Sequence, residues 1–114
     1  MEDFVHDQFL LGVRLFNEGR FFEAHEVWET LWQAAAGDSR TLYQGLIQAA
    51  AALHHAARGN HAGARSLWNK AEVKLELSPA EYEGAAIGQL LAELKFYFSF
   101  EKFGTPPLLR IVER

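Results

Sequence analysis

The residues best able to do chemistry lie in one polar stretch, residues 21–29, where a helix would be expected to bury apolar side chains. His25 and Glu29 are four positions apart, so on a helix they are surface neighbours. Both lie at the rim of the apolar face, beside Trp28 and Trp32, and we expect them to be partly buried. An imidazole and a carboxylate that leave water need hydrogen-bond partners, so this pair predicts a polar cluster or a site.

Partners for this pair are available on a long uncharged segment, residues 42–57. At helical spacing Gln44, Gln48 and His55 share one face of that segment, opposite its apolar face. If this face meets the helix of His25, the polar side chains come together, with His54 as a further candidate. The candidate binding cluster comprises His25, Glu26, Trp28, Glu29, Trp32, Tyr43, Gln44, Gln48 and His55.

The cluster allows three interpretations. It could be a structural hydrogen-bond cluster that clamps two helices, or a groove for a small molecule or a peptide, walled by aromatic rings. It could also be a divalent metal or acid/base site of a small enzyme that uses His25 and Glu29. Two ligands are too few for a metal unless His54, His55 or a dimer mate completes the set, and a glutamate, Glu29, stands where zinc proteases carry their second histidine. We favour a non-catalytic binding module, with the enzyme as the alternative.

Composition excludes several other classes of protein. The chain has 114 residues, 49% of them hydrophobic, which is enough for one domain with its own core. It has no cysteine, so disulfides and thiolate metal sites are excluded. The net charge is −4 and the basic residues are scattered, so we expect no nucleic-acid binding. No apolar stretch is long enough to span a membrane, and the acidic start lacks the features of a signal peptide. We expect a soluble cytoplasmic protein, which could form a homodimer.

Glycine, asparagine and proline divide the chain into helical segments, expected over residues 3–17, 21–35, 39–58, 61–77 and 87–103. Asp38 or Ser39 is the expected N-cap of the third segment. The sequence Ser-Pro-Ala-Glu at 78–81 predicts a capping box, hence a further helix start. In the last segment three phenylalanines form one stripe, and the apolar tail at 108–111 is expected to pack back as an extended strap.

One short internal sequence repeat bears on the architecture. Residues 19–24 are repeated in kind at 59–64, forty residues later, and Trp28 and Trp68 then fall at matching positions. Each copy resembles the turn and second helix of a tetratricopeptide-type repeat. The sequence therefore predicts an all-α fold in a single domain, residues 1–114. It would be a compact bundle of about five helices, built from two tetratricopeptide-like hairpins plus a C-terminal helix and tail.

Three blocks of this sequence carry a family resemblance. Residues 16–29 read FNEGRFFEAHEVWE, residues 43–50 read YQGLIQAA, and a third block places Gly-Asn at 59–60 before Gly-Ala at 63–64. Together, over roughly residues 4–77, they resemble the bacterial and archaeal family catalogued as domain of unknown function 309. The resemblance implies a compact helical bundle and no particular activity or cofactor. The family motif falls on His25, Glu26, Trp28, Glu29, Gly45 and Gln48. Within a helix Gly45 would cost about 1 kcal/mol relative to alanine, which close helix packing or ligand access would explain.

Overall fold

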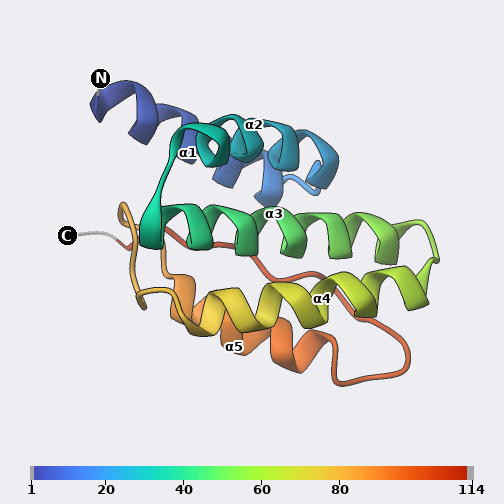
Figure 1. The fold of residues 1–114 in the computed structure, drawn as a ribbon. Helices are drawn as coiled ribbons and strands as arrows, with labels where there is room; N and C mark the ends of the chain where they lie inside the picture. Colours follow the sequence, from blue (N-terminus) through green and yellow to red (C-terminus); the bar gives the residue numbers. More distant parts are fainter. Residues whose placement is uncertain (1, 113–114) are drawn as a thin grey trace.

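The computed structural model describes residues 2–112 and contains five α-helices, which confirms the all-α prediction. The helices are α1 (Glu2–Asn17), α2 (Phe21–Ala34), α3 (Gly37–Ala57), α4 (His61–Glu76) and α5 (Ile87–Tyr97). Figure 1 shows α1 and α2 on one side of α3, with α4 and α5 on the other. None of the helices in this part of the chain is long and apolar enough to cross a bilayer.

The central element is α3, which packs against α2 on one side and α4 on the other. Its apolar positions, such as Leu46 and Leu53, are buried, as the lack of charged residues over 42–57 predicts. A Cβ added at Gly45 would lie 3.0 Å from Leu75 Cδ2 and 3.1 Å from Lys74 Cβ. Glycine in this helix therefore serves the close approach of α3 and α4.

The two turns that contain the internal sequence repeat have the same backbone conformation. Gly19 and Gly59 each have φ +79°, the left-handed conformation that ends many helices. In each turn the next residue donates its N–H to a carbonyl five positions earlier. The corresponding bonds run from Arg20 N to Leu15 O and from Asn60 N to His55 O, both 2.9 Å. The internal sequence repeat therefore corresponds to a repeat of local backbone structure.

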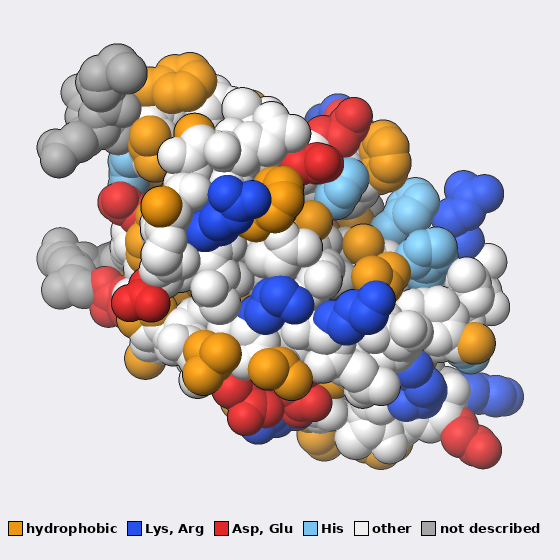
Figure 2. Space-filling view, viewed as in Figure 1, with side chains coloured by type: hydrophobic (Ala, Val, Ile, Leu, Met, Phe, Trp, Pro, Cys, Tyr) orange, Lys and Arg blue, Asp and Glu red, His pale blue; other side chains and the backbone are white. Residues whose placement is uncertain are grey.

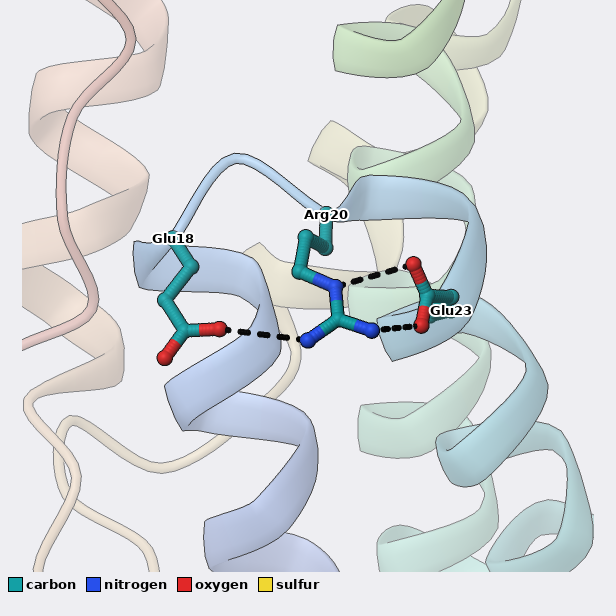
Figure 3. Close-up of polar contacts among 3 residues, drawn as sticks. All are labelled: Glu18, Arg20 and Glu23. Atoms are coloured by element: carbon teal, nitrogen blue, oxygen red, sulfur yellow. Dashed lines mark hydrogen bonds and ion pairs between the residues drawn. The ribbon is translucent and has the colours of Figure 1, made fainter.

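The side chains that complete these turns differ. In the first turn the Arg20 guanidinium lies between two carboxylates (Figure 3). Its Nε donates to Glu23 at 2.9 Å and its Nη1 lies 3.5 Å from Glu18. In the second turn Asn60 caps α4 by accepting the N–H of Gly63 at 3.0 Å. The second turn thus has a helix cap where the first has an ion pair.

Two predicted helix starts are wrong. α3 begins at Gly37, with Ala36 as an extended N-cap, so neither Asp38 nor Ser39 caps it. No helix follows the expected capping box, because Ser78 Oγ instead donates to Lys74 O at 2.8 Å and completes the end of α4. The chain then makes a tight turn at Glu83 and Gly84. Both residues have a positive φ, and a right-handed helix cannot contain residues with a positive φ.

The last helix is shorter than predicted and ends at Tyr97. Arg65 of α4 donates to Phe98 O at 2.7 Å and also to Phe100 O, and these bonds hold the chain in a loop. The predicted phenylalanine stripe is therefore broken. Phe96 and Phe100 are exposed, whereas Phe98 is buried and stacks on Trp68 with ring centroids 5.2 Å apart.

The tail crosses back over the bundle as an extended strap, as predicted (Figure 1). Leu109 is fully buried. The side-chain amide of Asn17, at the end of α1, holds its backbone on both sides. Asn17 Nδ2 donates to Leu109 O at 2.9 Å, and Leu109 N donates to Asn17 Oδ1 at 2.8 Å. One side chain therefore pins the C-terminal segment to the first helix.

Candidate functional site

One edge of helix α2 carries both aromatic and polar side chains and faces the second half of α3. Phe22, His25 and Glu29 are spaced at three and four residues, so they line this edge in a row. The apolar positions between them, Ala24 and Trp28, point into the core. The edge therefore carries an aromatic ring, an imidazole and a carboxylate while the helix remains anchored behind it.

His25 and Glu29 form the predicted i, i+4 pair, and both side chains are partly buried, as expected. His25 Nε2 lies 3.3 Å from Glu29 Oε2, and the exposed side-chain fractions are 27% and 43%. With Nε2–H donating to the carboxylate, the other ring nitrogen, Nδ1, is buried without a hydrogen-bond partner. This geometry fixes the ring but does not bury a charge.

Opposite this edge, α3 contributes two adjacent histidines to an open groove. Phe22, His25, Ala51, His54 and His55 line a hollow of about 340 Å³, the α2–α3 groove. The Phe22 ring lies 5.6 Å from the His25 ring and 5.8 Å from the His54 ring, between centroids. Figure 2 shows histidine side chains gathered at this end of α2 and α3, with hydrophobic surface between them.

The cap of the next helix fixes the proton position on His55. Asn60 Oδ1 accepts the N–H of Gly63, so its Nδ2 faces His55 Nδ1 at 3.1 Å. An amide NH₂ can only donate, so His55 Nδ1 accepts and the neutral ring carries its proton on Nε2. His55 is thereby held as a hydrogen-bond donor beside the groove.

His54 is held neutral near pH 7. Its pKa is lowered below the usual value of 6.5, chiefly by desolvation. The positive charge of Arg58 and the neighbouring His55 and His25 lower it further. The groove therefore combines apolar surface with one imidazole, His54, whose charged form is disfavoured.

Two predicted groove residues belong to the core instead. Trp28 is fully buried and its Nε1 donates to Phe9 O of α1 at 3.2 Å. Tyr43 is also buried, and its hydroxyl bonds that of Tyr82 at 2.6 Å. Burial raises the pKa of Tyr43 well above its ordinary value. Neither ring lines an open groove, because both turn toward α1 and the loop before α5.

The other predicted residues do not line the groove and do not form one cluster. Glu26 is exposed, and Gln44 is half-buried. Trp32 is half-buried beneath the guanidinium of Arg40, 4.2 Å from the ring centroid. Gln48 is half-buried with Oε1 enclosed and unpartnered, so the expected hydrogen bond between Gln48 and His25 is not formed.

The metal alternative gains no support from this arrangement. Within residues 2–112 no group of three or more His, Asp or Glu side chains is placed to hold a metal ion. A stable site needs at least three protein ligands in most proteins. His25 and Glu29 would have to recruit ligands from another molecule.

Sequence reasoning missed Phe22 and the role of Asn60, and it placed Ala51 on the face of Gln48 and His55 without including it in the site. Phe22 stands three positions before His25, and this spacing alone places it on the same edge of α2. Asn60 precedes the fourth predicted helix and is a residue type favoured at helix caps, but its bond to His55 depends on the turn that brings the two side chains together.

Comparison with known proteins identifies the family of this chain. Residues 9–67 match the family model described as "Domain of unknown function (DUF309)". The chain is also 30% identical, over 96 residues, to an uncharacterized protein of Aquifex aeolicus (strain VF5). That alignment covers 83% of this chain and 29% of the relative, so the chain spans less than a third of the relative's length. The family match covers α2 and α3, which form the groove, and the chain belongs to the DUF309 family.

Proposed function

We propose that this protein is a non-catalytic binding module and that the α2–α3 groove is its ligand site. The observation that carries the proposal is an exposed phenyl ring, Phe22, next to three imidazoles in one open hollow. Ligand sites commonly combine apolar walls with a few polar groups that fix orientation. A hollow of about 340 Å³ suits a small molecule or a single aromatic side chain of a peptide.

The exposure of the His25–Glu29 pair argues against a purely structural role. A clamp would have to be buried, because an exposed ion pair contributes only about 0–1 kcal/mol. Both side chains are only half-buried, with 27% and 43% of their surface exposed, so water reaches the pair. We therefore expect His25→Ala to change the free energy of unfolding by less than about 1 kcal/mol, measured by urea denaturation. A loss of several kcal/mol would support the structural clamp.

The chemistry of the groove favours a ligand with a flat apolar body and a hydrogen-bond acceptor. Phe22 and Ala51 offer apolar surface, and His55 Nε2–H offers a donor. Neutral His54 brings no charge near pH 7, so strong selection for anions is not expected. Glu29 at the rim disfavours anions further.

Three matched probes test this chemistry: benzamide, benzoate and benzylamine, which share one ring and differ in charge. Titrations followed by the imidazole signals in ¹H–¹³C NMR should show benzamide binding with a Kd of about 1 mM, as its size allows. The shifts should be confined to His25, His54 and His55. Equal, unlocalised shifts from all three probes would contradict a defined site.

The alternative is a small metal-dependent or acid/base enzyme in which His25 and Glu29 take part. The 3.3 Å contact between their side chains is the observation in its favour. Elemental analysis of untagged protein separates the two functions. About one divalent metal per chain or dimer, lost in Glu29→Gln, would favour the enzyme, whereas the binding module needs no metal.

We further propose that the two helical hairpins, α1–α2 and α3–α4, are related like tetratricopeptide repeats. The matching backbone of the turns at Gly19 and Gly59 supports this relation.

We also propose that the protein works in the cytoplasm. The absence of cysteine supports this location. The location of a fluorescent fusion protein in a bacterial cell would test it directly.

A further inference from the structure

A second hollow lies beside α5, away from the α2–α3 groove. It measures about 580 Å³, and its walls include Phe96, Tyr97 and Phe100. Phe96 is 69% exposed and Phe100 is 48% exposed, and their rings meet edge-to-face with centroids 5.0 Å apart. Large exposed rings grouped beside a hollow are typical of an interaction surface. We call these residues the α5 face.

The α5 face is held rigidly by α4. The Arg65 guanidinium donates to Phe98 O at 2.7 Å and to Phe100 O, and it lies 4.8 Å from the centre of the Phe103 ring. The loop that carries Phe100 is therefore fixed before any partner arrives. A surface that is already ordered loses little conformational entropy on binding.

The same hollow carries an acid and a base with unmet partners. Glu93 Oε1 is buried without a hydrogen-bond partner, and Oε2 has only a loose contact of 3.9 Å with Arg110. Lys102 lines the same hollow and forms no ion pair with any residue in 2–112. The two side chains also do not pair with each other, although they share one pocket.

We propose that the α5 face is a dimer interface, and that its partner is a second copy of this chain. A two-fold interface needs a patch that is complementary to itself. This face has a projecting ring, Phe96, next to a hollow, and an unpaired lysine next to an under-satisfied carboxylate. In the dimer each Phe96 enters the hollow of the other copy. Lys102 of each copy then lies at Oε2 of Glu93 in the other, because Oε1 is enclosed within its own chain.

Sedimentation velocity over a concentration series tests this interface. The wild-type chain should show a reversible monomer–dimer equilibrium. Phe96→Asp should weaken it roughly 30-fold or more, as loss of a central interface ring does. Phe4→Asp is the control, because Phe4 is 58% exposed but lies on α1. Equal weakening by both variants, or a wild-type chain that stays monomeric at every concentration, would overturn the proposal.

A charge reversal tests the pairing itself. Glu93→Lys and Lys102→Glu should each weaken the dimer, because each places like charges across the interface. The double variant should recover most of the wild-type dissociation constant. Circular dichroism confirms that each variant is folded. Failure of the double variant to recover, with both single variants weakened, would show that these residues do not meet across a two-fold axis.

Discussion

At the scale of single residues, the contact between α2 and α3 contains polar atoms whose bonding capacity is not met. His25 Nδ1 and Gln48 Oε1 are both buried without a partner. A buried polar atom without a hydrogen bond costs about 1–3 kcal/mol, so this contact is less stable than an apolar one. Proteins often retain such a cost at functional sites, and here one of the two atoms belongs to a residue that lines the proposed groove, His25.

Replacing Gln48 by methionine should therefore stabilise the fold. The two side chains are similar in length, and methionine removes the unpartnered acceptor. We expect the free energy of unfolding to rise by about 1–2 kcal/mol in urea denaturation. Gln44→Met is the matched control, because Gln44 is half-buried on the same face but has no enclosed unpartnered atom. A loss of stability in Gln48→Met alone would mean that the Gln48 amide is satisfied in solution.

The lowered pKa of His54 makes stability depend on pH. A histidine whose pKa is lower in the folded state binds protons more readily when unfolded, so acid favours unfolding. The penalty is absent above the unfolded pKa of about 6.5 and grows as the pH falls through it. Wild-type protein should therefore lose more stability than His54→Gln between pH 7.5 and pH 5.5, two conditions about one unit either side of that pKa. His61→Gln, at an exposed position at the start of α4, is the control variant. Equal pH slopes for all three proteins would refute this account.

At the scale of helices, local signals predicted most boundaries and tertiary contacts set the rest. Gly19 and Gly59 end their helices because each supplies a positive φ, which the sequence shows. The early end of α5 depends on Arg65, which is distant in sequence, so no local pattern could predict it. Helical spacing also places Trp28 on the apolar face of α2, but it cannot say that α1 packs there. A Cβ at Gly12 of α1 would lie only 2.1 Å from Trp28 Nε1.

The C-terminal strap gives a test at this scale. Asn17→Asp keeps an acceptor for Leu109 N but replaces the donor to Leu109 O with a second oxygen, which repels it. We expect the amide of Leu109 to exchange its hydrogen at least about tenfold faster, with little change in α3. Unchanged exchange at Leu109 would show that burial of its side chain alone holds the strap.

At the scale of the whole molecule, the proposed groove and the chain ends lie apart. Figure 1 shows the start of α1 and the end of the tail at one end, whereas the α2–α3 groove lies toward the other end of α3. The Aquifex relative has more than three times the length of the aligned segment. A tag added at either end of this chain should therefore leave probe binding unchanged, which a parallel titration of tagged and untagged protein checks.

The central claim is that the α2–α3 groove is a binding site, and the comparison of two phenylalanine variants tests it most directly. Benzamide is titrated into wild-type, Phe22→Ala and Phe4→Ala protein while the imidazole signal of His55 is followed. We predict a Kd of about 1 mM for wild type and Phe4→Ala, and at least about tenfold weaker binding for Phe22→Ala. Equal affinity in all three proteins, or no shift of His55 in any, would contradict the claim.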